Sequence, residues 1–158
     1  MTMHLVEGDL LKATEQIIGH QVNCQAVMGS GVAKQIKRKY PHVYKEYVQF
    51  CHMHHEDLLG KCQFVEVGQT GERYVANLFG QERYGTDGRK YTNDEALRSA
   101  LQQVYAVAKA KQFSVALPYK IGCDRGGGDW EAVSAMIRDV FKDVQVTLYR
   151  WPPESKDT

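Results

Sequence analysis

The stretch Leu117-Pro-Tyr-Lys-Ile-Gly-Cys-Asp-Arg-Gly-Gly-Gly-Asp-Trp130 predicts a strand, a glycine-rich loop and a helix in immediate succession. The apolar run 113–117 has the length and composition of a buried strand, and Asp129 is a good N-cap for the helix after the loop. The apolar residues of that helix recur at helical spacing, at Trp130, Val133, Met136, Ile137 and Val140. Such a loop holds phosphate in many α/β proteins, because glycines let backbone N–H groups approach an anion at the positive end of a helix. Taken alone, the loop is equally compatible with a plain connection.

A second stretch of the same kind lies nearer the N-terminus. Residues 17–23 predict a strand, and Met28-Gly-Ser-Gly-Val-Ala33 opens a helix that continues to Tyr40. Two glycine loops, each between a strand and a helix, predict the two sides of one anion site. A Rossmann-type dehydrogenase is disfavoured, because Lys34 stands where the third glycine of that fingerprint falls. The Gly-Lys-Ser/Thr ending of a P-loop is also absent.

The remaining elements predict an α/β protein with one mixed sheet and helices on both faces. Further strands are expected at 3–6, 61–67, 73–79 and 144–149, with 61–67 and 73–79 paired as a hairpin. Thr92-Asn-Asp-Glu95 reads as a capping box that opens a helix. The inward residues expected for that helix are Ala96, Leu97, Ala100, Leu101, Val104 and Ala108. Helical turns are also expected at 10–14 and after Pro41, where Val43, Tyr47, Phe50 and Cys51 can face the core. The polar segment 80–90 is a loop long enough to carry function.

Composition narrows the class of protein. A length of 158 residues predicts one domain over 1–151, with 152–158 as a flexible polar tail. A formal net charge of +1 gives no strong electrostatic attraction to nucleic acids or membranes. No apolar run approaches the length of a membrane span. Four cysteines without paired spacing indicate free thiols in a cytoplasmic protein. A monomer is expected, although oligomeric state cannot be read from the sequence.

The run Cys51-His-Met-His-His-Glu56 is the strongest candidate for a metal site. His52 and Glu56 would share a helix face, but no second pair of ligands stands at zinc-site spacing. A solvated helix end is therefore the favoured interpretation, and neither a metal nor a cofactor is predicted.

Several motifs together resemble the macrodomain family over essentially the whole chain and in the right order. These motifs are Val6-Glu-Gly-Asp-Leu10, Asn23 with Met28-Gly-Ser-Gly-Val-Ala33, and Leu117-Pro-Tyr-Lys-Ile-Gly-Cys123 with Gly127-Gly-Asp-Trp130. The resemblance is to the branch of terminal ADP-ribose–protein glycohydrolases, yeast-type ADP-ribose-1″-phosphate phosphatases and antitoxin macrodomains that remove ADP-ribose from DNA. It implies a three-layer α/β/α sandwich with a central mixed β-sheet. The implied partner is ADP-ribose, free or attached to protein, nucleic acid or phosphate.

The resemblance also implies a set of ADP-ribose-binding residues. Asp9 and the backbone of Leu10 would meet the adenine, with Tyr149 or Trp151 stacking nearby, although an aspartate before a helical turn is by default only a cap. Asn23 would hold the hydroxyls of the distal ribose, or alternatively satisfy a backbone group at the end of its strand. The two loops and their flanks supply the residues around the ribose and diphosphate: Met28, Gly29, Ser30, Gly31, Val32, Ala33, Pro118, Ile121, Gly122, Cys123, Arg125, Gly126, Gly127 and Gly128.

The catalytic residues of the protein-glycohydrolase relatives are missing in register. In those relatives a lysine before the capping-box helix can attack the ribose carbon, and an aspartate in the second glycine loop handles protons. Here the nearest equivalents are Gln81 or Glu82 for the lysine and Gly126 for the aspartate.

Other residues are then considered for catalysis. Asp124, which stands where the family usually has glycine, is the catalytic candidate and would orient a water. The alternative is a solvent-facing turn residue, because a carboxylate facing the diphosphate would repel it. His20 has the chemistry of a general base, but a mid-strand histidine is more often packed in the core.

Two functions follow from these features. The first is hydrolysis of a bond at C1″ of the distal ribose, with a bound water as nucleophile. The second is a reader that binds ADP-ribose without turnover. The missing lysine and aspartate favour the reader, whereas a small self-contained chain favours the enzyme, and we expect the enzyme by family analogy.

Overall fold

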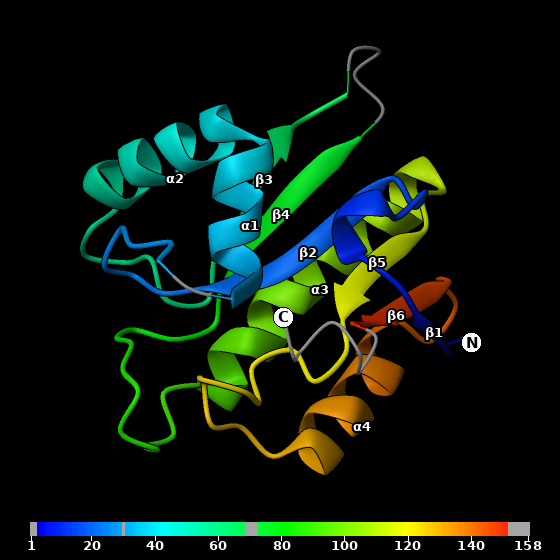
Figure 1. Cartoon of the computed structure of the whole chain (residues 1–158). Helices are drawn as coiled ribbons and strands as arrows, with labels where there is room; N and C mark the ends of the chain where they lie inside the picture. The colour runs from blue at the N-terminus through cyan, green and yellow to red at the C-terminus, as the bar shows by residue number, and fades with distance from the viewer. Residues whose placement is uncertain (1–2, 30, 69–72, 152–158) are drawn as a thin grey trace.

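The computed structural model of the chain describes residues 3–29, 31–68 and 73–151. Six strands form one sheet in the spatial order β1-β6-β5-β2-β4-β3 (Figure 1). They are β1 (Met3–Glu7), β2 (Ile17–Val22), β3 (Cys62–Glu66), β4 (Tyr74–Phe79), β5 (Val115–Pro118) and β6 (Val146–Arg150). Every neighbouring pair is parallel except β3 and β4, which form the antiparallel hairpin that the sequence predicts. The predicted mixed sheet is therefore confirmed.

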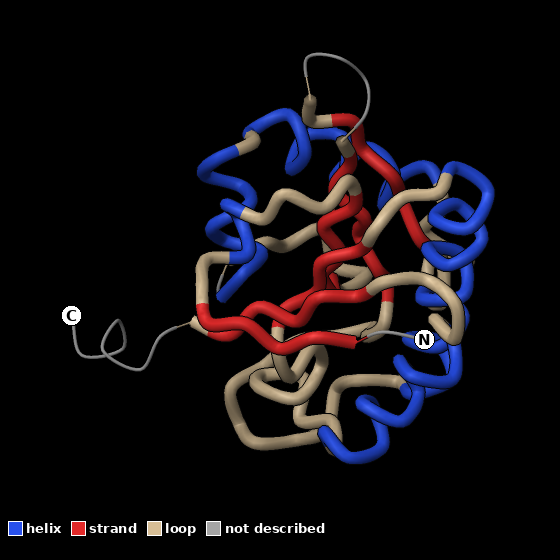
Figure 2. Tube along the Cα trace, turned by 90° about the vertical axis from the view of Figure 1, so that its right-hand side faces the viewer, coloured by secondary structure: helices blue, strands red, loops and turns tan. Residues whose placement is uncertain are grey.

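Helices cover both faces of this sheet and complete three layers (Figures 1 and 2). One face carries α1 (Gly31–Lys39) and α2 (Pro41–Met53), and the other carries α3 (Asp94–Lys111) and α4 (Trp130–Val140). A short 3₁₀ turn, η1 (Leu10–Lys12), follows β1. The α/β/α sandwich that the family resemblance implied is thus present.

Strand β2 runs through the middle of the molecule and is buried on both faces. Ile17 packs in the core cluster under α3 and α4, whereas Val22 packs in the cluster under α1 and α2. A parallel strand between two helix layers must bury alternate side chains in both directions, which explains its nearly continuous apolar sequence. His20 and Gln21 interrupt that apolar run close to the carboxyl end of β2.

Two predicted helix features need correction. The N-cap of α3 is Asn93 and not Thr92, because the Asn93 side chain accepts a hydrogen bond from the Ala96 N–H at 3.0 Å. The Thr92 hydroxyl instead donates to the Gly122 carbonyl at 2.6 Å. Helix α2 ends at Met53, so Glu56 does not share a helix face with His52.

The tail 152–158, Ser30 and the hairpin turn at 69–71 lie outside the described residues. Within the described residues, no three His, Cys, Asp or Glu side chains gather as a metal site would require, and no helix is both long and apolar enough to cross a bilayer. All four cysteines are free thiols, as expected.

Candidate functional site

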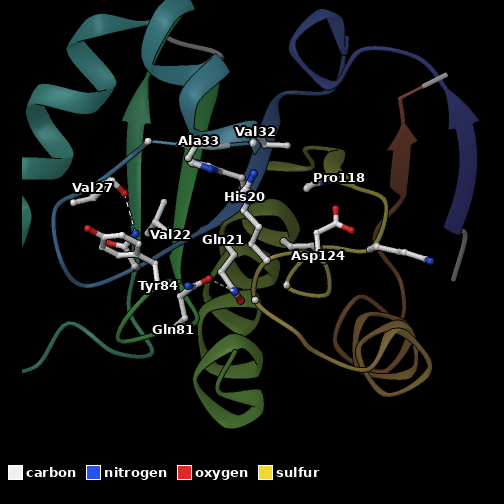
Figure 3. Close-up of a pocket in the computed structure, with 18 of the residues that line it drawn as sticks. His20, Gln21, Val22, Val27, Val32, Ala33, Gln81, Tyr84, Pro118 and Asp124 are labelled. Atoms are coloured by element: carbon white, nitrogen blue, oxygen red, sulfur yellow. Dashed lines mark hydrogen bonds between the residues drawn. The ribbon is translucent and has the colours of Figure 1, made fainter. Parts of the chain in front are cut away.

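A cavity of about 580 Å³ opens where the carboxyl ends of β2 and β5 meet the start of α1 (Figure 3). This volume is typical of small-molecule sites, and parallel sheets place ligands at this edge. Both glycine loops line it, together with the loop that follows β4. The lining residues are His20, Gln21, Val22, Asn23, Val27, Gly29, Gly31, Val32, Ala33, Gln81, Tyr84, Gly85, Thr86, Pro118, Tyr119, Lys120, Ile121, Gly122, Asp124, Arg125 and Gly126.

The segment 23–27, which leads into the first glycine loop, is held by the side chain of Asn23. Its Oδ1 accepts hydrogen bonds from the Gln25 N–H and the Tyr47 hydroxyl, both at 2.9 Å, and its Nδ2 donates to the Val27 carbonyl at 2.9 Å. Asn23 therefore satisfies backbone groups at the end of its strand and also lines the cavity. An amide nitrogen carries two hydrogens, so one remains for a ligand.

The second glycine loop is shaped by backbone hydrogen bonds. The Gly126 carbonyl accepts from the N–H groups of Tyr91 and Thr92, at 2.7 and 2.9 Å, and the Gly128 N–H donates to the Gly122 carbonyl at 2.9 Å. A Cβ atom on Gly126 would lie only 2.7 Å from the Gly122 carbonyl oxygen and would also overlap the Thr92 hydroxyl. The loop is therefore a fixed structure, and its backbone has no room for an aspartate at position 126.

Gln21 joins the second glycine loop to the chain leaving β4. Its Nε2 donates to Gln81 Oε1 at 2.7 Å and to Thr92 Oγ1 at 2.9 Å. Gln81 thus lies at the cavity, where the resemblance places the family lysine, and its own Nε2 donates to the Arg83 carbonyl at 2.7 Å. A neutral amide in these bonds has no nucleophilic amine to offer. Glu82, the other equivalent considered, is exposed and does not line the cavity.

His20 is both packed in the core and part of the cavity wall. Its side chain is 1% exposed, and its Nε2 lies 2.6 Å from Asn77 Oδ1. Burial lowers the pKa of His20 to about 4, an effect only partly offset by the hydrogen bond to Asn77, so the ring is neutral near pH 7. Sequence reasoning did not single out Asn77 or its partner Gln63, although a polar residue within a buried apolar strand is a readable signal.

The charged groups at the cavity come mainly from the second glycine loop. Asp124 and Arg125 are exposed side chains of that loop, and Lys120 precedes it in a left-handed backbone conformation with φ of 62°. Figure 3 shows Asp124 on the side of the cavity that includes Pro118, opposite Val27 and Tyr84. No described residue forms a hydrogen bond with the Asp124 side chain. The described lining residues thus include one carboxylate, Asp124, and two cations, Lys120 and Arg125.

The structure gathers most of the predicted ligand-binding residues at the cavity and leaves others elsewhere. Asp9 caps η1, with its Oδ1 accepting from the Leu11 N–H at 2.9 Å, and the Tyr149 hydroxyl donates to Glu15 at 2.7 Å. Gly127 lines a smaller adjoining hollow of about 260 Å³. The predicted residues outside the wall of the main cavity are Asp9, Leu10, Met28, Cys123, Gly127, Gly128 and Tyr149. Ser30 lies outside the described residues.

Some lining residues were not predicted. They flank the two glycine loops or belong to the polar segment 80–90, whose length was the available signal. These residues are Gln21, Val22, Val27, Tyr84, Gly85, Thr86, Tyr119 and Lys120.

Comparisons with known proteins agree with the motifs and the fold. The Macro domain family model matches residues 20–137. The DNA ADP-ribosyl glycohydrolase of Mycobacterium tuberculosis is 31% identical over 150 residues, which cover 92% of this chain and 41% of that protein. The ADP-ribose 1″-phosphate phosphatase of Saccharomyces cerevisiae is 29% identical over 109 residues, covering 67% of this chain and 62% of that one.

Solved structures give the same result. The macrodomain of Mycobacterium tuberculosis DarG superimposes with a TM-score of 0.80 at 29% identity, covering 96% of this chain and 98% of that one. A protein of unknown function from Bacteroides thetaiotaomicron superimposes with a TM-score of 0.84 at 29% identity, covering 95% and 98%. The chain spans about two fifths of the length of the DNA ADP-ribosyl glycohydrolases that it matches. From its motifs, its fold and these matches, the chain belongs to the macrodomain family.

Proposed function

We propose that this chain binds ADP-ribose in the cavity and hydrolyses a bond at C1″ of the distal ribose. The observation that carries the proposal is that two glycine loops, far apart in sequence, line one cavity of about 580 Å³ at the carboxyl edge of the sheet. The relatives named above are a DNA ADP-ribosyl glycohydrolase and an ADP-ribose 1″-phosphate phosphatase, and both names describe removal of a group from the distal end of ADP-ribose.

The start of α1 supports the binding of a diphosphate. Gly31, Val32 and Ala33 line the cavity in the first turn of this helix, where backbone N–H groups have no partner within the helix. The first turn contains no acidic residue, and Lys120 and Arg125 line the same cavity. Unpaired N–H groups, the positive end of the helix dipole and two cations favour a doubly negative ligand.

The lining residues favour water as the nucleophile. Gln81 and Gly126 stand where the family resemblance implies a lysine and an aspartate, so position 81 supplies no amine for attack on C1″. Asp124 is the one carboxylate among the described lining residues. Water oxygen would bond to C1″ as the bond to the leaving group breaks, with the water proton passing to Asp124 and from there to the leaving oxygen.

A reader that does not turn over its ligand is the second candidate. It is favoured by the exposure of Asp124, because catalytic groups are normally held in place by packing and hydrogen bonds. Substitution of this residue separates the candidates. In a hydrolase Asp124→Asn should lose turnover and keep ADP-ribose affinity, and unchanged turnover would remove Asp124 from the mechanism.

The deciding experiment measures turnover on three substrates in parallel. They are ADP-ribose-1″-phosphate, a glutamate-linked ADP-ribosyl protein and ADP-ribosylated single-stranded DNA, with a calorimetric titration of free ADP-ribose alongside. Release from any of them identifies an enzyme, whereas tight binding without release identifies a reader. Gly31→Glu tests the cavity, since its Cβ would meet no atom within 4 Å and its carboxylate at the start of α1 should abolish binding. Gly31→Ala is the matched control, because it carries the same backbone strain at a φ of 60° without the charge. Undiminished affinity in Gly31→Glu would contradict the cavity assignment.

A further inference from the structure

Three buried polar side chains form a row across the face of the sheet that α1 and α2 cover. His20, Asn77 and Gln63 stand on the neighbouring strands β2, β4 and β3, and the strand register aligns His20 with Asn77 and Asn77 with Gln63. All three are at least nine-tenths buried. Polar groups in such a place must be hydrogen-bonded, because burying them unpaired is costly.

The direction of each hydrogen bond in the row is fixed from its far end. Gln63 Nε2 donates to the Glu46 backbone carbonyl at 3.1 Å, so Gln63 turns its Oε1 toward Asn77. Asn77 Nδ2 donates to that oxygen at 3.0 Å, which turns Asn77 Oδ1 toward His20. A carbonyl oxygen only accepts, so His20 Nε2, 2.6 Å away, must carry the proton.

This chain of bonds determines the state of the other ring nitrogen. A neutral imidazole protonated on Nε2 presents a bare lone pair on Nδ1, which can only accept a hydrogen bond. Nδ1 is buried and has no hydrogen-bond partner among the described residues. The two ring nitrogens diverge, so Nδ1 faces away from β4. Figure 3 shows the His20 side chain beside Val32 and Ala33 at the start of α1, and His20 lines the cavity.

We propose that His20 Nδ1 accepts a hydrogen bond from a hydroxyl group of the distal ribose of ADP-ribose, and that Asn77 and Gln63 hold His20 in the tautomer that can do so. This inference rests on the proposed function. Of the ligand groups at this end of the cavity, an ionised diphosphate offers acceptors only, whereas a ribose hydroxyl can donate to Nδ1. Asp9, Leu10 and Tyr149, assigned to the adenine end, do not line the cavity, whereas Asn23, assigned to the distal ribose, lines it three residues beyond His20.

His20 would then be a specificity-determining residue. A site with an unpaired buried acceptor discriminates strongly against a ligand that lacks the matching donor. ADP, which has the diphosphate but no distal ribose, is the natural comparison ligand. The expected signature is a loss of preference for ADP-ribose over ADP whenever Nδ1 ceases to be an acceptor.

The primary test is long-range ¹H–¹⁵N NMR of the ¹⁵N-labelled protein, with ADP-ribose at a concentration that calorimetry shows to be saturating. The free protein should show His20 protonated on Nε2 near pH 7, and ADP-ribose should shift the Nδ1 resonance far more than ADP does. His42, whose Nε2 lies 2.9 Å from the exposed Glu66 carbonyl, is an internal control that should not respond. A proton on Nδ1 in the free protein, or an unmoved Nδ1 at saturation, would overturn the assignment.

Variants test the row separately from the ring. His20→Phe should weaken ADP-ribose binding about five- to tenfold, the worth of one hydrogen bond, and weaken ADP binding less. Gln63→Leu removes the far end of the row without touching the cavity and should mix the His20 tautomers, with a smaller loss of ADP-ribose affinity. Gln103→Leu is the matched control, because Gln103 donates to the Gly60 carbonyl at 2.8 Å and does not line the cavity.

The possible results separate this inference from the function on which it rests. If Gln63→Leu remains folded and keeps both the parent tautomer and the parent ratio of ADP-ribose to ADP affinity, the row has no positioning role and the proposal fails. If ADP-ribose binds but the Nδ1 resonance of His20 does not shift, this proposal is overturned and the proposed function is not. Absence of ADP-ribose binding by the parent protein overturns the proposed function and this assignment together.

Discussion

The two glycine loops lie at one cavity but are built on different principles. The segment 23–27 that leads into the first is held by one side chain, Asn23, whose amide forms hydrogen bonds with three groups of the surrounding chain. The second, 122–128, takes its shape from main-chain hydrogen bonds and from the close approach of backbone to backbone. The first should therefore tolerate added volume and be sensitive to loss of an amide. The second should tolerate loss of a side chain and be sensitive to added volume.

The largest effect is expected from added volume in the second loop. Gly126→Asp should lower the free energy of unfolding by roughly 4 kcal/mol, because overpacking against the Gly122 carbonyl adds to the burial of an unpaired carboxylate. Denaturant titration measures this loss, and the variant should gain no turnover. Gly29→Ala is the matched change in the first loop, where a Cβ meets only Val27 at 3.5 Å, and should be close to neutral. Equal losses of unfolding free energy in the two variants would contradict the proposed difference between the two loops.

Acid should lower the free energy of unfolding through His20, which lies on the strand that leads into the first loop. Because the pKa of buried His20 lies at about 4 rather than near its ordinary value of 6.5, the unfolded chain binds more protons between these pH values. His20 therefore costs stability as the pH falls from about 6.5 to 4, by up to about 3 kcal/mol, and has no such effect above that window. The measurement is the free energy of unfolding at pH 7 and pH 5 for the parent and for His20→Asn. The same pH dependence in both proteins would exclude His20 as its source.

Removal of the Asn23 amide should destabilise the segment that leads into the first loop. Asn23→Ala leaves the Val27 carbonyl and the Gln25 N–H without their partner, and a loss of about 2 kcal/mol is expected from groups left unsatisfied. ADP-ribose affinity measured by calorimetry should fall in the same variant, because the loop it shapes lines the cavity. Asn23→Asp keeps the acceptor for Gln25 and Tyr47 and should lose less stability. Full stability in Asn23→Ala would show that the loop holds its shape without this side chain.

The smallest effect is expected from the side-chain contact in the second loop. Thr92→Val removes the hydroxyl that donates to Gly122 and accepts from Gln21. Gln21 keeps its hydrogen bond to Gln81 and both N–H bonds to Gly126 stay intact, so only about 1 kcal/mol should be lost. The shift in thermal midpoint would show whether this loss is smaller than that of Asn23→Ala. A larger loss would mean that the second loop also depends on a side chain.

Sequence patterns predicted the elements well because their signals are local. Helical spacing after Asp129 and the glycines between β5 and α4 need no knowledge of the rest of the fold, and α4 begins as expected at Trp130. The assignment of Thr92 as the cap of α3 failed because Asn93 is an equally good capping residue one position later. The choice between them was made by the distant Gly122 carbonyl, which engages the Thr92 hydroxyl.

The polar contacts of the site could not be predicted for a similar reason. Gln21, Gln81 and Thr92 meet only because β2 lies beside β4 and the second glycine loop folds over them. The pairing of His20 with Asn77 depends on the register of two parallel strands that are separated along the chain by α1, α2 and β3. Local composition marks such residues as unusual within their strands but does not name their partners.

The crowding at Gly126 also has an evolutionary consequence. In a lineage with this loop, a single substitution of Gly126 by aspartate would be strongly destabilising, since the Thr92 hydroxyl and the Gly122 carbonyl already fill the space beside the Cα. The order of changes matters: position 92 must shrink and the 122 carbonyl must turn away before position 126 can acquire a side chain. Such sign epistasis would keep the two kinds of loop in separate branches even where their ligand is the same.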